Sequence, residues 1–226
     1  MPEEYDNKSE DQKKYNKELV EGYLKAEKGL VPNTGKYWDA VYQYEAQNKL
    51  SRADADRWGI LGNYIKTKKN ILDFGCGWGE FIGAMKKHFP EINFTGIDIS
   101  SWAIDVGKNL FTNCNFICSD KLEGENYDLI LMSHILEHFK EPEKYVNDAY
   151  NRLIDDGLLL IVMPANDNEW HEHERVWTLE NFRQFFKSLD GWKWILVYRP
   201  DTGANFHDGR PFEEMIAILR KVKKTQ

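Results

Sequence analysis

Three alternating glycines follow a short apolar run and lie between two acidic residues. Residues 71–80 read Ile-Leu-Asp-Phe-Gly-Cys-Gly-Trp-Gly-Glu, which is typical of a buried strand, a tight turn and the start of a helix. Glycine lets the backbone turn sharply and lets a ligand approach without a Cβ in its way. The spacing is G-x-G-x-G, and Glu80 stands where the dinucleotide fingerprint G-x-G-x-x-G has its last glycine. Asp73 and Glu80 would repel a pyrophosphate, so we expect a ligand with positive charge; the alternative is an ordinary turn in which Glu80 favours the helix dipole.

Acidic residues also end the next two expected strands. Asp98 lies about 20 residues beyond the glycine turn, where a carboxylate can accept hydrogen bonds from ribose hydroxyls. Asp120 follows the strand after that, where it could accept from an adenine amino group. Either acid alone could cap a helix or belong to a turn. A nicotinamide enzyme would also carry Asp98, so this acid alone does not choose the ligand. Acids at three successive strand ends favour a nucleoside ligand, and Asp73 and Glu80 favour one with positive charge, such as S-adenosylmethionine (SAM), over a pyrophosphate.

A fourth segment completes a recognisable series. Residues 127–138 read Tyr-Asp-Leu-Ile-Leu-Met-Ser-His-Ile-Leu-Glu-His. In this order the four segments resemble the class I, Rossmann-like SAM-dependent methyltransferases of the small-molecule type, over roughly residues 61–222. The resemblance implies an α/β three-layer sandwich with a seven-stranded, mostly parallel sheet whose last strand is antiparallel. It also implies S-adenosylhomocysteine (SAH) as the product.

The resemblance places the cofactor at the carboxyl ends of the first strands. Tyr37 and Trp38 resemble an aromatic pair that touches the methionine end of the cofactor in many members, although packing on the sheet edge is an equal alternative. Cys76 lies inside the turn, has no C-x-x-C partner and is interpreted as a small residue that fits. The expected cofactor-binding residues are Tyr37, Asp73, Gly75, Cys76, Gly77, Asp98, Ile99, Ser119, Asp120, Lys121, Ser133 and His134.

Histidines supply the candidate base. Methyl transfer requires an aligned acceptor, and a hydroxyl acceptor must also lose a proton, which suits an imidazole. We expect His173 or His171 to act, with His134 lining the cofactor pocket and His138 either catalytic or structural. The expected acceptor-binding residues are Trp170, Arg175, His207 and Arg210.

A metal is the weaker alternative at these loops. His171 and His173 flank Glu172 and could ligate an ion. However, H-x-H within a run of acidic residues is common in polar loops, and most members of the class need no metal. We therefore expect no metal site.

The elements that must position these residues alternate along the chain. Strands are expected near 70–74, 93–98, 114–118, 127–132, 157–163, 193–199 and 213–221, and helices near 79–88, 101–110, 141–154 and 178–189. Residues 36–49 and 51–66 are helix-like, and we expect residues 1–66 to form a helical cap or lid over a core at 67–226. The chain, 1–226, is predicted to be one methyltransferase domain.

Composition limits the partners. The 226 residues carry a formal charge of −7, which disfavours nonspecific duplex binding. Three cysteines, a polar acidic start and no long apolar run favour a cytoplasmic protein without signal peptide or membrane segment. We expect a small-molecule acceptor, no nucleic acid and a monomer or homodimer.

The preferred acceptor is a hydroxyl of a sugar, nucleotide sugar or glycan precursor, favoured by the aromatic and histidine-rich loops. An RNA or protein methyltransferase is an alternative, although Ser133 to Leu136 replace the N/D-P-P-Y-like motif of base-nitrogen methylators. Further alternatives are a cofactor-binding partner subunit without activity and a nicotinamide oxidoreductase, which Glu80 disfavours.

Overall fold

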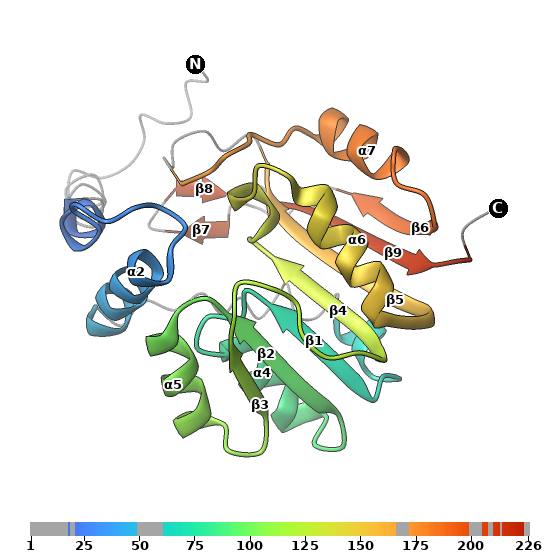
Figure 1. Ribbon diagram of the computed structural model, residues 1–226, viewed down its shortest axis with the longest axis horizontal. Coiled ribbons are helices and arrows are strands. Elements are labelled where there is room, and N and C mark those ends of the chain that lie inside the picture. The colour runs from blue at the N-terminus through green and yellow to red at the C-terminus, as the bar shows by residue number, and fades with distance from the viewer. Residues whose placement is uncertain are drawn as a thin grey trace.

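The computed structural model describes residues 18, 21–48, 61–165, 172–198, 205–207, 210–212 and 214–223. The apolar runs form strands, and the amphipathic segments between them form helices (Figure 1). The strands are β1 (Asn70–Phe74), β2 (Asn93–Asp98), β3 (Asn115–Cys118), β4 (Tyr127–Ser133), β5 (Leu153–Pro164), β6 (Trp192–Tyr198), β7 (Asn205–His207), β8 (Arg210–Phe212) and β9 (Glu214–Lys221). The helices are α2 (Gly35–Gln47), α4 (Glu80–His88), α5 (Ser101–Leu110), α6 (Pro142–Arg152) and α7 (Leu179–Lys187), with a 3₁₀ turn η2 (Leu136–His138).

Seven strands form one sheet in the order β3-β2-β1-β4-β5-β9-β6. Strands β1 to β5 pair in parallel, whereas β9 runs antiparallel to both β5 and β6. The chain proceeds outward from β1 to β3 and then returns to β4 on the other side of β1, so the topological switch point lies between β1 and β4. Open α/β sheets bind ligands at the carboxyl ends of their strands beside such a point.

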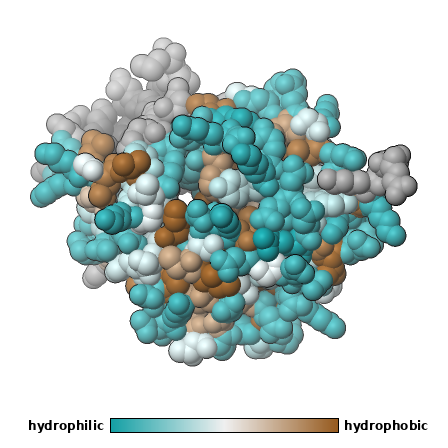
Figure 2. Space-filling view, in the orientation of Figure 1, coloured by the Kyte–Doolittle hydropathy of each residue, from teal (hydrophilic) through white to brown (hydrophobic). Residues whose placement is uncertain are grey.

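Side chains of successive strand residues point to opposite faces of the sheet and enter two cores. Leu159 and Ile161 of β5 pack with the phenylalanines of α7, whereas Leu158 and Leu160 pack with Ile82 of α4. In Figure 1, α6 and α7 lie in front of the sheet and α4 lies behind it. Figure 2 shows mostly hydrophilic residues on the front face, with hydrophobic residues gathered between α5 and α6. The three-layer α/β fold and the antiparallel strand β9 are therefore confirmed.

Helix α2 is held on the core by polar contacts. The Asp39 carboxylate accepts hydrogen bonds from the hydroxyls of Ser100 and Ser101 and from the backbone N–H of Trp102 at 3.0 Å. These groups form the first turn of α5, whose unpaired N–H groups and positive dipole end favour a carboxylate. These contacts hold α2 next to the carboxyl end of β2, where α5 begins.

One element was not predicted. The strands expected from the sequence leave residues 200–212 without one, but residues 205–207 and 210–212 pair as a short antiparallel hairpin, β7–β8. Pro211 and the short polar runs around it concealed the strands, since proline is unusual within a sheet. Among the described helices, none is long and apolar enough to cross a membrane.

Candidate active site

The glycine turn after β1 adopts backbone conformations that other residues rarely take. Gly75 and Gly79 both have φ of +81°. A Cβ on Gly79 would lie 2.6 Å from the ring of Phe116, and one on Gly75 would lie 3.0 Å from Ile135. Glycine is therefore required here by both the backbone and the space available. The turn passes directly into α4, whose first turn carries Glu80.

Asp98 at the end of β2 fastens this turn. Its Oδ2 accepts hydrogen bonds from the Gly77 N–H at 2.8 Å and from the Tyr42 hydroxyl at 3.2 Å, while Oδ1 accepts from the Ser100 N–H at 2.8 Å. The side chain is 4% exposed. Asp98 thus joins the glycine turn, α2 and the start of α5 at one carboxylate.

Asp73 ends β1 beside Asp98 and is buried as well. Burial raises the pKa of Asp73 to about 8, and the negative charge of Asp98 adds to the shift. Burial and the same two carboxylates raise the pKa of the Cys76 thiol well above its ordinary value, so Cys76 is not a thiolate nucleophile at neutral pH. The pair of acids makes this pocket favourable for a positively charged ligand.

The exit of β4 gathers histidines and glutamates. His134 takes a left-handed backbone conformation with φ of +52°, which is uncommon for a residue with a side chain. Its Nε2 lies 2.8 Å from Oε1 of Glu214, the first residue of β9, and its Nδ1 lies 3.5 Å from Oε1 of Glu137. Both carboxylates are almost fully buried. His134 therefore connects the exit of β4 with the start of the antiparallel strand.

Glu137 lies in η2 and is 1% exposed. Burial by itself would raise the pKa of Glu137, but His134, His138 and His173 outweigh that effect, and its pKa lies below the ordinary value. Neither carboxylate oxygen of Glu137 has a hydrogen-bond partner among the described residues. One ligand-type atom from each of Glu137, His138 and His173 lies within 4.8 Å of the other two. We call these three residues the β4 cluster.

Three distant segments meet around the β4 cluster. The Asn33 side-chain amide donates to the carbonyl oxygens of Glu172 at 2.8 Å and His138 at 3.4 Å. The Glu174 N–H donates to the Glu137 carbonyl at 2.9 Å. The loop before α2, the exit of β4 and the segment after β5 are thus joined by hydrogen bonds to backbone carbonyls, two from the Asn33 side chain and one from a backbone N–H.

Aromatic rings lie between this cluster and the glycine turn. The Trp38 ring centroid is 5.1 Å from that of His138 and 5.7 Å from that of Tyr42, which in turn contacts Trp78 in the glycine turn. Tyr37 is 2% exposed. Burial and hydrogen bonding to Glu27 and Glu172 raise its pKa far above the ordinary value, so its hydroxyl remains a neutral donor.

The residues predicted for the cofactor lie along one edge of the sheet. Apart from Tyr37, which lies on α2, they are in the last residues of the four adjacent strands β3, β2, β1 and β4 or just beyond them. Ser119 is held there because its N–H donates to the Asp98 carbonyl at 3.0 Å. Asp120 and Lys121, beyond it, are exposed. Their contacts with the cofactor remain predictions.

The residues predicted for the acceptor are less completely placed. Arg175 lies with its guanidinium carbon 5.1 Å from the ring centroid of Trp177, a core residue. His207 and Arg210 are paired across the β7–β8 hairpin, and the structure describes their backbone alone. Trp170 and His171 lie outside the described residues.

Several residues at this edge were not among the predicted site residues. Tyr42 and Asn33 reach the site from 56 and 105 residues away in the sequence, so no local pattern marks them. Glu137 stands within the segment that carries the resemblance, yet its burial is visible only in the fold. Glu214 begins β9. The sequence predicts a strand near residues 213–221 but does not mark Glu214 as a site residue.

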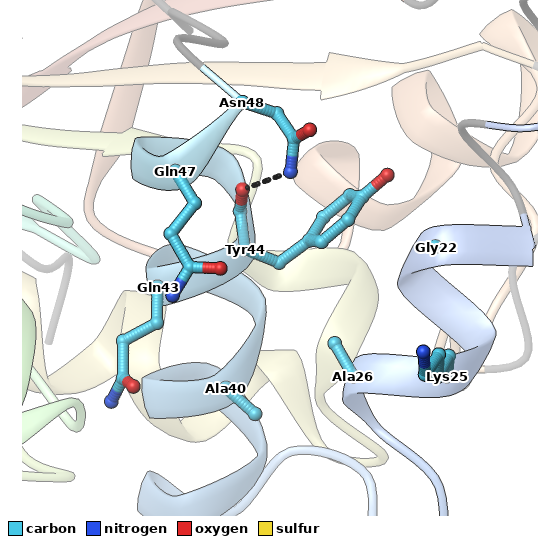
Figure 3. A pocket seen from close by; sticks show the side chains of 8 residues that line it. All are labelled: Gly22, Lys25, Ala26, Ala40, Gln43, Tyr44, Gln47 and Asn48. Atoms are coloured by element: carbon cyan, nitrogen blue, oxygen red, sulfur yellow. Dashed lines mark hydrogen bonds between the residues drawn. The ribbon is translucent and has the colours of Figure 1, made fainter.

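A separate hollow of about 540 Å³ lies between helical residues 21–26 and α2. Figure 3 shows its lining, in which Tyr44 and Asn48 face Gly22 and Lys25 across the hollow. It lies on the N-terminal helices, whereas the acidic residues and glycines lie at the strand exits. The hollow is therefore distinct from the candidate active site.

A family comparison agrees with this geometry. A family described as a methyltransferase domain matches residues 42–213, which is most of the chain and includes six of the seven strands of the sheet; the seventh, β9, begins at the next residue. The chain therefore belongs to the class I SAM-dependent methyltransferase-domain family. The cofactor of this family is SAM, with SAH as its product. The buried acid pair and the glycine turn fit a cationic nucleoside of this kind.

Relatives differ in the atom that they methylate. Over 108 residues the chain is 32% identical to a ubiquinone biosynthesis O-methyltransferase of Coxiella burnetii, covering 44% of this chain and 45% of that protein. It is 29% identical over 112 residues to a ubiquinone/menaquinone biosynthesis C-methyltransferase of Campylobacter jejuni, covering 46% and 48%. The chain spans about half the length of the curated relatives it matches.

The fold has solved counterparts. A plantazolicin methyltransferase, solved with a triazolic substrate analogue and SAH, matches with a TM-score of 0.64 at 19% identity, covering 94% of this chain and 98% of that one. The N-methyltransferase NodS of Bradyrhizobium japonicum matches with a TM-score of 0.58 at 15% identity, covering 74% and 96%. At such identities the matches show a shared fold.

Proposed function

We propose that the protein transfers a methyl group from SAM to a hydroxyl of a small polar acceptor, such as a sugar, a nucleotide sugar or another glycan precursor. One observation carries the proposal: imidazole and carboxylate groups of the β4 cluster lie together at the strand exit that adjoins the glycine turn. A hydroxyl needs a proton acceptor before it can be methylated, whereas many nitrogen acceptors do not. The O-methyltransferase activity of the Coxiella relative is consistent with this choice.

The cofactor supplies an electrophilic methyl group on a sulfonium, and the chain supplies position and a base. The acceptor O–H proton passes to an imidazole nitrogen. The oxygen lone pair then forms the bond to the methyl carbon, and the electron pair of the broken C–S bond stays on sulfur. Alignment of the two reacting atoms accounts for much of the rate.

His173 is the preferred base among the described histidines. It is partly exposed, whereas His138 is 9% exposed and lies between the rings of Trp38 and His173. His134 is engaged with Glu214 at 2.8 Å. Of the two histidines in the β4 cluster, His173 is thus the more exposed residue, although its Nδ1 is buried.

We also propose that residues 1–226 act as one domain, with residues 1–66 covering the site. Asn33 and Tyr42, both from that segment, bond to the segments around the β4 cluster and to Asp98. Acceptor recognition by Trp170, Arg175, His207 and Arg210 belongs to the same proposal.

The first test is calorimetric titration with SAH, with NAD⁺ as the control ligand. We expect SAH alone to bind, because the acid pair disfavours a pyrophosphate. An acceptor screen with SAM over nucleotide sugars and small hydroxy compounds follows, with the product identified by mass spectrometry. Binding of NAD⁺ in place of SAH would overturn the cofactor site.

The second test is His173→Ala on the acceptor that the screen identifies. Loss of a general base should lower kcat by about 10²–10⁴-fold, while SAH affinity stays unchanged because His173 lies in the segment after β5 and not in the glycine turn. His88→Ala, an exposed histidine on α4, is the matched control and should retain full activity. An unchanged kcat in His173→Ala would exclude His173 as the base.

A further inference from the structure

We propose that the β4 cluster, Glu137, His138 and His173, binds a divalent transition-metal ion such as Zn²⁺, Mn²⁺ or Co²⁺ beside the cofactor. The proposal rests on the proposed function for its catalytic meaning, but the binding of the ion can be tested by itself. It differs from the expectation of no metal and from the His171–Glu172–His173 alternative. The fold brings Glu137 and His138, after β4, next to His173, in the segment after β5. No local sequence pattern predicts that these two segments meet.

The ligand set is of a kind that proteins use for metals. Two histidines with one carboxylate hold zinc in catalytic sites and leave a position open for water or substrate. The same combination holds other divalent ions of the first transition row. A tetrahedral ion with bonds of about 2.1 Å places its ligand atoms about 3.4 Å apart. The cluster atoms lie within 4.8 Å of one another, so a closure of about 1 Å would complete the site.

Glu137 provides the independent observation. Its side chain is 1% exposed, and neither oxygen has a hydrogen-bond partner among the described residues. Burying a carboxylate without hydrogen bonds costs several kcal/mol unless a cation or another donor compensates. The ion pair with His134 at 3.5 Å offsets part of the cost of burying Glu137. A bound cation would offset the rest.

His138 is oriented as metal-binding histidines usually are. Its Nδ1 lies 3.3 Å from the carbonyl oxygen of Glu172. A carbonyl can only accept, so Nδ1 carries the proton and Nε2 presents its lone pair. The same carbonyl accepts from the Asn33 amide at 2.8 Å, which fixes its position. Metal-ligating histidines commonly donate their other N–H to a backbone carbonyl in this way.

A two-histidine, one-carboxylate site leaves a coordination position open, and the proposed acceptor would bind there. A cation lowers the pKa of a bound hydroxyl as it does that of bound water. The acceptor oxygen would then bind the ion, and acceptors with two adjacent oxygen atoms, such as vicinal diols of sugars, would be favoured. In this arrangement His173 binds the ion instead of serving as the base, and the released proton would pass to His134, the imidazole at the exit of β4 that is not a ligand. His173→Ala then lowers kcat in either case, and the Co²⁺ titration distinguishes a ligand from a base.

The test is Co²⁺ titration of the full chain, freed of any affinity tag and stripped with a chelator. We expect one equivalent to bind and to produce visible absorption bands, and Zn²⁺ to displace it. Glu137→Gln and His173→Gln should each weaken Co²⁺ binding at least about tenfold. His88→Gln, the exposed histidine on α4, should bind as the wild type does, and SAH calorimetry on every variant confirms folding.

Two results would overturn the metal site. The first is no Co²⁺ binding below about 1 mM, which corresponds to only about −4 kcal/mol. The second is binding that survives both Glu137→Gln and His173→Gln. The outcomes also separate this site from the proposed function. If the stripped protein binds no Co²⁺ but is fully active, the metal site is wrong and the proposed function stands. If the protein binds Co²⁺ but methylates no hydroxyl acceptor, the metal site stands and the proposed function is wrong.

Discussion

Two carboxylates buried at the exits of β1 and β2 set the chemistry of the cofactor pocket. Asp98 uses its oxygens to hold the glycine turn, α2 and α5. Asp73, beside it, is 3% exposed and its pKa is raised to about 8, first by burial and then by Asp98. Such a pair is unfavourable in the empty protein and favourable around a cation. The acid pair therefore lowers the stability of the empty protein and raises its affinity for a cationic ligand.

Asp73→Asn should make the protein more stable in a pH-dependent way. A carboxyl whose folded pKa is raised contributes stability that is present below its unfolded pKa and is lost as pH rises toward its folded pKa. The wild type therefore loses stability between pH about 4 and about 8, and the amide does not. The pKa is raised by about four units and one unit corresponds to about 1.4 kcal/mol, so we expect a gain of up to about 5 kcal/mol at pH 8, vanishing near pH 4. Urea unfolding across this range measures it.

Asp105→Asn provides the control for that comparison. Asp105 is exposed on α5, so the same change of acid to amide should alter the free energy of unfolding by less than about 0.5 kcal/mol. Asp73→Asn should also bind SAH more weakly than the wild type and Asp105→Asn do. A variant that is less stable than the wild type at pH 8 would contradict the account of Asp73.

At the scale of elements, the sequence was most informative where a pattern is local. The strands before Asp73, Asp98 and Ser133 end within a residue or so of the prediction, because each apolar run stops at a polar residue or a glycine. The pairing of β7 with β8 was missed because each strand has three residues and one contains Pro211. Short strands are defined by their partner more than by their own composition.

The start of α7 gives a prediction at this scale. The Thr178 hydroxyl accepts from the Asn181 N–H while the Asn181 side chain accepts from the Thr178 N–H, a reciprocal capping box. The helix buries three phenylalanines against Trp177. Thr178→Ala should lower the free energy of unfolding by about 1 kcal/mol, measured by urea unfolding, and loosen the segment that leads from His173 into α7.

Thr178→Ser keeps the hydroxyl and is the control. It should retain most of the wild-type stability, because serine and threonine both cap helices well. If the alanine and serine variants were equally stable, the box would contribute nothing and α7 would be held by its aromatic face alone.

At the scale of the molecule, the site depends on contacts that no local pattern carries. Asn33 bonds to residues 105 and 139 positions away, and Tyr42 bonds to Asp98 across 56. The sequence placed the acids and histidines at the correct strand exits, since a parallel sheet brings those exits to one edge. It could not show that Glu137 would be buried between three histidines, because that follows from how α2 and the segment after β5 pack over η2.

These contacts make the attachment of α2 part of cofactor binding. Asp39 holds α2 to the first turn of α5, and Tyr42 of the same helix bonds to Asp98. Asp39→Ala should therefore displace Tyr42 and weaken SAH binding by about tenfold, which is about 1.4 kcal/mol. A ligand at 100 times its Kd stabilises the folded state by about 2.7 kcal/mol. At the same SAH concentration the variant should gain only about half of that, measured as the shift in unfolding free energy.

Gln43→Ala separates loss of the attachment from general damage to the helix. Gln43 lies on the same helix and is one of the residues that line the separate hollow (Figure 3). It should keep the full stabilisation by SAH even if it lowers stability slightly. If Asp39→Ala also kept the full stabilisation, α2 would be a passive cover. If SAH stabilised Asp39→Ala less than the wild type but stabilised Gln43→Ala fully, α2 would contribute to cofactor binding through Tyr42 and Asp98.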